Sequence, residues 1–185
     1  MAKGEKFERS VYNRLVYNFG DACVFHNCLV PKNSKADTEI DIVMLTHRAI
    51  YVIECKNYNG ELSGIDTDLY WKQQTEKHKG VVKSPVFQNR KHKERLKKFL
   101  GRTSVPVISV SVLADKCSFD CVERSFDDYI VYRKDMVALL KREEMEGSSI
   151  MTSKQFGRIG KLLAECEADA EELRAFKEKM KRIAG

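Results

Sequence analysis

The stretch that decides the fold is EIDIVMLTHRAIYVIECK, residues 39–56. Two runs of similar length, 39–46 and 49–56, flank a short connection at His47-Arg48, and their valine and isoleucine residues occupy both faces of an extended chain. Strands that are apolar on both faces lie in the middle of a sheet and are covered on each side. The stretch therefore predicts two central strands of an α/β domain, joined as a hairpin.

The register of this hairpin brings two carboxylates together. With a two-residue or four-residue loop, paired positions sum to 95, so Val43 faces Val52 and Asp41 faces Glu54. Opposed side chains lie about 5 Å apart, and two carboxylates there repel unless a cation lies between them. Alternation along the strand places Lys56 on the face of Glu54 and Cys55 on the opposite face.

Two interpretations of this cluster remain open from the residues alone. In the first, Lys56 forms a simple salt bridge with one carboxylate at the end of a strand. In the second, the acid pair and nearby carbonyl oxygens are hard ligands for Mg²⁺, which keeps several waters and recruits phosphate oxygens from its substrate. Lys56 then orients a nucleophilic water or stabilises charge on phosphorus, and the expected reaction is phosphodiester hydrolysis.

The remaining pattern predicts helices and strands around this hairpin. We expect helices over 4–19, 87–100 and 134–142, strands over 23–30, 61–65, 69–72, 105–113 and 129–132, and an exposed loop over 33–37. The expected fold class is therefore α/β, with a mixed central β-sheet flanked by helices and a helical segment at the C-terminus.

The C-terminal segment begins at a plausible N-cap, Thr152, and carries apolar residues at spacings of three and four from Phe156 to Met180. It either folds on the domain as a helical hairpin or forms one long helix that pairs with a copy of itself, giving a homodimer. Lys177 interrupts the apolar seam, which favours packing on the domain. We expect a main domain over residues 1–147 and a helical extension over 148–185.

Composition and charge narrow the class of protein. The 185 residues carry a net charge of +6, and the stretch 76–102 alone contains ten basic and two acidic residues. Such a concentration is either a surface for a polyanion or a solvated helix face. The six cysteines are expected to be reduced packing thiols. No apolar run suggests a membrane span or secretory signal, so we expect a soluble cytoplasmic protein.

Several ordered motifs resemble a known family. Asp41 followed by Glu54-Cys55-Lys56 is similar to the D…(D/E)xK signature of the PD-(D/E)XK nuclease superfamily, whose fold is restriction-endonuclease-like. The flanking motifs resemble the nuclease-related domain, NERD, over about residues 4–113. These motifs are Gly4-x-x-Phe7-Glu8, Thr38-Glu39-Ile40-Asp41, Val52-Ile53 through Gly60, Trp71, Ser84-Pro85-Val86-Phe87-Gln88 and His92.

The resemblance implies roles for individual residues. Asp41 and Glu54 would bind Mg²⁺ or Mn²⁺, with the Cys55 carbonyl completing the inner ligand set, and Lys56 would serve the attacking water. Glu8 corresponds to a first-helix glutamate that faces the site, and Gln88 to a glutamine of the helix packed over the catalytic strands.

Candidate nucleic-acid contacts come from the basic helix and from aromatic residues. Arg90, Lys91, Lys97 and Lys98 are candidates for contact with the sugar-phosphate backbone, which positions a duplex without reading its sequence. His92 shares a helix face with Gln88 and either contacts phosphate or the acidic site, or packs as a neutral residue between helix and sheet. Tyr58, Tyr70 and Trp71 either stack on bases or, as is more common in short strands, fill the core.

The leading functional hypothesis is a Mg²⁺-dependent nuclease that cleaves DNA, with RNA as the other candidate substrate, and shows little base preference. The second is a non-catalytic nucleic-acid-binding module of the same fold. The third is an assembly subunit that dimerises through its C-terminal helices. The presence of Asp41, Glu54 and Lys56 together favours catalysis, because binding requires only the basic surface.

Overall fold

The computed structural model describes residues 3–31, 38–101, 104–125, 128–146 and 151–184. The elements are α1 (Lys3–Phe19), η1 (Asp21–Cys23), β1 (Val24–Val30), β2 (Thr38–Leu45), β3 (Ile50–Lys56), β4 (Gly60–Ile65), β5 (Tyr70–Gln74), β6 (Lys79–Lys83), α2 (Pro85–Leu100), β7 (Val107–Leu113), β8 (Cys117–Glu123), β9 (Tyr129–Tyr132), α3 (Met136–Met145), α4 (Ser153–Ala164) and α5 (Ala170–Ala184). The loop expected over 33–37 and the domain boundary expected at 147 lie outside the described residues.

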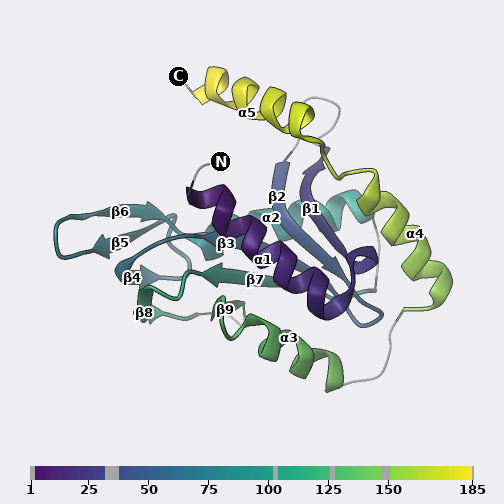
Figure 1. The fold of residues 1–185 in the computed structure, drawn as a ribbon, viewed down its shortest axis with the longest axis horizontal. Helices are drawn as coiled ribbons and strands as arrows, with labels where there is room; N and C mark the ends of the chain where they lie inside the picture. Colours follow the sequence, from purple (N-terminus) through teal and green to yellow (C-terminus); the bar gives the residue numbers. More distant parts are fainter. Residues whose placement is uncertain (1–2, 32–37, 102–103, 126–127, 147–150, 185) are drawn as a thin grey trace.

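The central sheet has the order β1-β2-β3-β7-β9, with β2 and β3 in its interior (Figure 1). β1, β2 and β3 are antiparallel neighbours, whereas β7 and β9 run parallel to β3, so the sheet is mixed. The hairpin pairs Val43 with Val52 and Leu45 with Ile50, which confirms the register predicted from the sequence. The predicted α/β class with a restriction-endonuclease-like mixed sheet is likewise confirmed.

Both faces of the central sheet are buried, as the apolar pattern of β2 and β3 predicts. Ile42, Met44, Tyr51 and Ile53 face a core formed with α1 and α3. Val43, Leu45, Ile50 and Val52 face a second core formed with α2 and α4. The two strands are therefore held rigidly between helical layers, and whatever projects from their ends is fixed in place.

A second sheet, of order β6-β5-β4-β8, was not expected from the sequence. It extends from the end of the central sheet as a separate group of strands (Figure 1). Its inner face contributes Leu62, Trp71 and Val122 to a third core. β6 and β8 are the two strands that the sequence analysis did not predict, and β6 occupies part of the basic stretch that was expected to surround a single helix.

The C-terminal segment is two helices rather than one. The predicted N-cap is confirmed, because Thr152 and Gln155 form a capping box at the start of α4. α4 buries Ile159 and Leu163 against the α2 side of the sheet, as expected for packing on the domain. The chain between α4 and α5 then bonds to the outer edge of β1, where the Leu29 N–H donates to the Cys166 carbonyl at 2.8 Å, so this sheet edge is covered.

α5 is more exposed than α4. It lies beyond the edge of the sheet at the C-terminal end of the chain (Figure 1). None of its described side chains is fully buried, and Lys177 forms an ion pair with Glu39 at 3.0 Å. Across the described residues, the helices are all too short or too polar to cross a bilayer.

Candidate active site

Asp41 and Glu54 lie at adjoining ends of β2 and β3. The described ladder ends with the pair Ile42 and Ile53, and Asp41 and Glu54 occupy the next position in the same register. The Cys55 N–H, instead of extending the ladder, donates to Asp41 Oδ2 at 2.8 Å. This hydrogen bond fixes the Asp41 carboxylate beside the start of the Glu54-Cys55-Lys56 motif.

A local irregularity in β1 and β2 accompanies the placement of Asp41. Ile40 and Val43 both face the α2-side core, as do their respective partners Cys28 and Phe25, although residues three apart in a regular strand face opposite sides. Between these partners, Asn27 has a φ of 53°, in the left-handed region. The alternation of side chains between the two faces of the sheet therefore breaks at Asp41 and at Asn27, its neighbour across the ladder. The Asp41 side chain consequently does not follow the regular alternation of β2.

Glu54 is completely buried and faces α2. Its Oε1 lies 2.5 Å from Lys56 Nζ, and its Oε2 lies 3.2 Å from Nδ1 of the buried His92. Each carboxylate oxygen therefore has one nitrogen partner. Because a carboxylate oxygen has two lone pairs, each oxygen keeps one that is available to a metal ion.

The floor of the site is a polar seam between α2 and the sheet. Asn89, wholly buried, donates through Nδ2 to the Val52 carbonyl, Ser109 Oγ and the Val110 carbonyl at 2.8, 2.9 and 3.1 Å. Ser111 is the register partner of Glu54 on β7, and its buried hydroxyl has no hydrogen-bond partner in the part of the chain that the structure describes. These bonds anchor α2 and thereby hold His92 over Glu54.

The charged groups of the site shift one another's pKa values. Burial, followed by the charges of Glu54 and Glu8, raises the pKa of Asp41 well above its usual value, despite the opposing effects of Lys56 and the Cys55 N–H. For Glu54, burial favours the neutral acid, but the contacts with His92 and Lys56 outweigh it and lower the pKa. The site therefore contains one easily ionised carboxylate and one that favours its protonated form.

Lys56 keeps its charge in this environment. Burial opposes the ammonium form, but the carboxylates of Glu54 and Asp41 outweigh that penalty and raise its pKa above the usual range. Tyr58, two residues further along, donates from its hydroxyl to the Lys83 carbonyl at 2.8 Å. The end of β6 is thus tied to the segment that follows the site.

Glu8 approaches the site from α1. Its Oε1 lies 2.8 Å from His26 Nε2 on β1, and its charge contributes to the raised pKa of Asp41. Among the described residues, its side chain bonds to His26 alone, so its catalytic role stays a prediction. Gln88 lies one turn before His92 on α2, is half-buried, and makes no side-chain hydrogen bond with the described residues. Its catalytic role stays a prediction.

The donor set suits a magnesium ion but is not a complete protein cage. Within the described part of the chain, no three histidine, cysteine, aspartate or glutamate side chains converge to hold a metal. Mg²⁺ commonly uses only one or two carboxylates and retains waters for its other positions. Asp41, Glu54 and a main-chain carbonyl such as that of Cys55 therefore fit this ion.

The predicted nucleic-acid contacts fall into different environments. The guanidinium of Arg90 binds Asp66 and Asp128, and His92 faces Glu54, so both point to internal partners rather than to the exposed helix surface. Lys91, Lys97 and Lys98 are exposed on α2, as a backbone contact requires. Their binding role stays a prediction, and Arg90 and His92 hold the helix and the site together.

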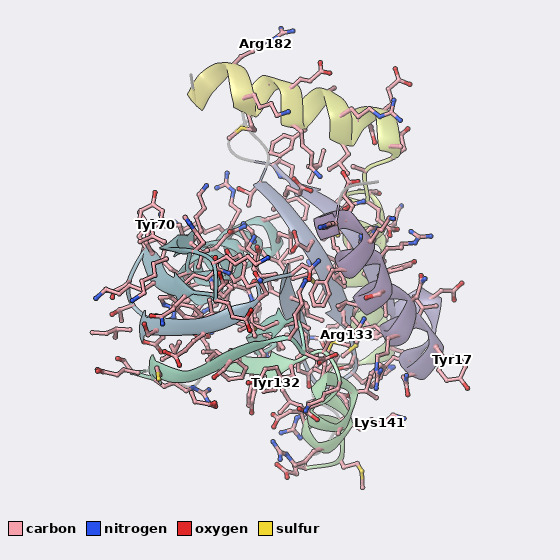
Figure 2. The ribbon with its side chains drawn as sticks, turned by 60° about the vertical axis from the view of Figure 1, so that its left-hand side comes forward. Tyr17, Tyr70, Tyr132, Arg133, Lys141 and Arg182 are labelled. Carbon is pink, nitrogen blue, oxygen red and sulfur yellow. The ribbon has the colours of Figure 1, made fainter. Side chains whose placement is uncertain are left out.

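The basic surface also includes the hairpin of β5 and β6. Cross-strand pairing puts Lys72, Lys79 and Lys83 on one exposed face of that hairpin, together with Tyr70 and Val81. Tyr70 projects outward from the second sheet (Figure 2), whereas Trp71 is buried and donates from Nε1 to the Ile65 carbonyl. Of the three aromatic candidates, Tyr70 is therefore the one open to a ligand.

Three residues of the site were not recognised in the sequence. Asn89 has a usable signal, because it lies on the apolar stripe of α2 with Val86 and His92, and a polar residue there must find buried partners. Ser111 carries no local signal, since its position beside Glu54 depends on the parallel pairing of β7 with β3. Asn27 is identified only by its backbone conformation.

Comparison with known proteins agrees with this geometry. The model of the family described as nuclease-related domain matches residues 3–114, which include α1, the acidic ends of β2 and β3, α2 and β7. An uncharacterized protein of Bacillus anthracis is 29% identical over 114 residues, and the match covers 61% of this chain and 53% of that protein. The chain thus spans about half the length of the relative it matches. No solved structure matches the chain. Since the family match covers more than half of the sequence and includes every residue of the acidic cluster, the chain belongs to the nuclease-related domain family.

Proposed function

We propose that this protein is a metal-dependent endonuclease of the PD-(D/E)XK type that hydrolyses DNA phosphodiester bonds in the presence of Mg²⁺ or Mn²⁺, with little base preference. The observation that supports it most is the convergence of Asp41, Glu54 and Lys56 at the adjoining ends of β2 and β3, where a fully buried carboxylate lies between Lys56 and His92. Two carboxylates held side by side, one of them fully buried, repel each other, an arrangement typical of a functional site rather than of one built only for stability.

The proposed roles follow from the positions of the side chains. Asp41, Glu54 and the Cys55 carbonyl hold the metal. When bound, the ion supplies Lewis-acid stabilisation of the charge that develops on the phosphoryl oxygens. His92 and Asn89 position Glu54 and α2 without contacting the substrate. Because Glu54 is fully buried, its electrostatic effects are stronger than they would be at the surface.

Lys56 acts in this mechanism as a cation. Its raised pKa means that the side chain remains an ammonium at neutral pH, so it is not the general base that deprotonates water. An ammonium donates hydrogen bonds and can orient the attacking water or stabilise negative charge on the phosphoryl group. Glu54, 2.5 Å away, keeps that ammonium beside the metal ligands.

Substrate binding is proposed to use the two basic surfaces that flank the site. Lys91, Lys97 and Lys98 lie on α2, and Lys72, Lys79 and Lys83 lie on the β5–β6 hairpin. Contacts of this type neutralise phosphates and are independent of base sequence. Tyr70 adds an exposed ring that can stack on an unpaired base.

The test is incubation of the full chain with supercoiled plasmid and Mg²⁺ or Mn²⁺, beside Asp41→Asn and Lys56→Met. Lys116→Met and Asp120→Asn are matched controls. These substitutions remove the same charges at exposed positions on or beside β8, outside the acidic cluster. We expect nicking by the parent and both controls, and none by the two site variants.

Two other outcomes contradict the nuclease proposal in different ways. Retention of DNA by every variant without cleavage would identify a binding module. Absence of retention at low salt would leave assembly as the function, and the mass of the full chain in solution would then decide whether α5 pairs with a second copy. An RNA substrate tested in parallel separates the two nucleic acids.

A further inference from the structure

A hollow of about 630 Å³ lies against the solvent side of α2. Its lining includes Lys91, Arg95 and Lys98 from the helix and Thr38 from the start of β2. The opposite side of the helix, with Asn89, His92 and Leu96, is buried against the sheet. The hollow is therefore a surface feature of α2, separate from the packing face that positions Glu54.

Arg95 is the unusual residue of this hollow. Its Nε and Nη2 atoms are buried and have no hydrogen-bond partner among the described residues. Leaving a buried donor of a charged group unpaired costs considerable free energy. A native structure tolerates such a group mainly where water, an ion or a ligand supplies the missing acceptor.

Arg90, one turn and a residue earlier on the same helix, shows what a purely structural arginine looks like here. Its guanidinium binds the carboxylates of Asp66 and Asp128 and the Asp66 carbonyl. The fold thus provides acceptors where an arginine serves packing. Among the described residues, no such carboxylate is paired with Arg95, although Glu94 also lines the hollow and contacts Lys97 at 3.7 Å.

The cations around Arg95 match an extended polyanion better than a single small anion. Lys91 and Lys98 are seven residues apart, so along the helix axis they span about 10 Å. One strand of a duplex presents a phosphate about every 3.4 Å of axis, so this span corresponds to about three nucleotides. A guanidinium also offers its N–H groups as a planar fork that fits two phosphate oxygens.

The hollow and the acidic site are built on the same two elements, α2 and β2. His92, which contacts Glu54, precedes Arg95 by three residues, about 4.5 Å along the helix axis. On the other wall, Thr38 begins β2, three residues before Asp41. A phosphate held at Arg95 therefore lies within a few nucleotides of a bond placed at the metal ligands.

We propose that Arg95, with Lys91 and Lys98, forms a phosphate-binding subsite that holds the nucleic-acid backbone a few nucleotides from the scissile bond. This assignment rests on the proposed nuclease function for its substrate, but the binding of phosphate by Arg95 is independent of cleavage. Arg95 is a substrate-binding residue in this account, and the missing acceptors of its guanidinium are phosphoryl oxygens.

The first test measures binding of labelled duplex DNA by the full chain in EDTA, which withholds divalent metal and prevents hydrolysis. Arg95→Met is expected to weaken binding about 10- to 100-fold, the range of a lost charge-assisted hydrogen bond, and to lower the salt dependence by about one phosphate contact. Arg95→Lys should recover part of the affinity. Lys141→Met, which removes one charge from α3 far along the chain (Figure 2), should change affinity by less than about 2-fold.

The second test uses thermal unfolding with inorganic pyrophosphate as the probe. The parent melting temperature should rise with pyrophosphate, and that of Arg95→Met should not. Without pyrophosphate, Arg95→Met should melt above the parent, because the substitution removes an unpaired buried charge. A structural arginine would give the opposite result, a lower melting temperature.

Unchanged DNA affinity of Arg95→Met, or an undiminished response to pyrophosphate, would overturn the subsite. These outcomes are separate from the fate of the nuclease proposal. If the parent never cleaves DNA but its DNA affinity falls on substitution of Arg95, the subsite is supported and the nuclease function is contradicted. If the parent cleaves DNA, and Arg95→Met cleaves and binds DNA as the parent does, the nuclease function is supported and the subsite is contradicted.

Discussion

The Cys55 N–H donates to Asp41 Oδ2 at 2.8 Å, so a side chain of β2 is bonded to the backbone of β3 at the point where the ladder between the two strands ends. This bond replaces a main-chain pairing and holds the carboxylate next to Glu54. The cost is electrostatic, since burial and the neighbouring charges of Glu54 and Glu8 raise the pKa of Asp41. The arrangement therefore lowers the stability of the metal-free protein and creates a site that attracts a cation.

Asp41→Asn should stabilise the metal-free protein while removing activity. A carboxyl group whose pKa is higher in the folded than in the unfolded chain favours folding at low pH, and that contribution is lost as pH rises through the folded pKa. The gain in melting temperature should therefore be larger at pH 8 than at pH 5. Asparagine can still accept the Cys55 N–H. Cleavage should fall by about 10³-fold, because several kcal/mol of Lewis-acid stabilisation are lost.

The control for Asp41→Asn is Asp120→Asn, an exposed carboxylate on β8 that bonds to Ser118. It should leave both the melting temperature and the cleavage rate close to those of the parent. A melting temperature of Asp41→Asn that is below the parent at every pH would contradict the electrostatic account.

The pH dependence of cleavage should respond to the metal concentration. Metal and proton compete for Asp41, whose pKa is raised, so the rate should increase with pH as the carboxylate ionises. Tenfold more Mg²⁺ should move this rising limb to lower pH. Lys56 remains protonated over the same range and should add no second limb. A limb that stays at the same pH whatever the metal concentration would assign the titration to another group.

Substitution of Asn89 should affect stability, whereas substitution of Gln88, its neighbour on α2, should affect catalysis. Asn89→Ala removes a donor from three buried acceptors and should lower the free energy of unfolding by about 2 kcal/mol, measured in urea. Gln88→Ala should be nearly neutral for stability, because its side chain makes no hydrogen bond with the described residues. Its effect should appear in the cleavage rate instead. A large stability loss for Gln88→Ala with unchanged cleavage would reverse the two roles.

Gly60 should be intolerant of a side chain because of both its conformation and its surroundings. Its φ is 73°, and an added Cβ would lie 2.2 Å from the Gln74 carbonyl oxygen. Gly101 has the same φ but open space around it, so Gly101→Ala isolates the conformational cost, about 1–2 kcal/mol. Gly60→Ala should cost clearly more in urea unfolding. Equal losses for both would show that the backbone relaxes around Gly60 without strain.

Much of the central sheet was predictable because its signals are local. The apolar residues on both faces of 39–56 predicted buried strands, and the short connection at His47-Arg48 set the register that places Asp41 beside Glu54. The second sheet was missed for the converse reason. β6 has the sequence KGVVK, and of its two valines one is 70% exposed, so neither hydrophobic alternation nor length distinguishes it from a basic loop.

The site was predictable only in part. Asp41, Glu54 and Lys56 follow from strand register. For His92 the sequence left contact with phosphate, contact with the acidic site and neutral packing open, and the structure points it at Glu54. Arg90 was predicted to contact the sugar-phosphate backbone, and in the structure its guanidinium binds Asp66 and Asp128, which come from distant parts of the chain. Arg95 was not among the predicted nucleic-acid contacts, because an unpaired guanidinium can be recognised only once its surroundings are known.

The most direct test of the central claim is calorimetric titration of the full chain with Mn²⁺, beside Asp41→Asn and Glu54→Gln. The account predicts saturable binding to the parent with release of protons, since the metal displaces the proton of Asp41, and loss of that binding in both variants. Heat that is absent from the parent, or equal in all three proteins, would show that these two carboxylates do not bind a divalent ion together.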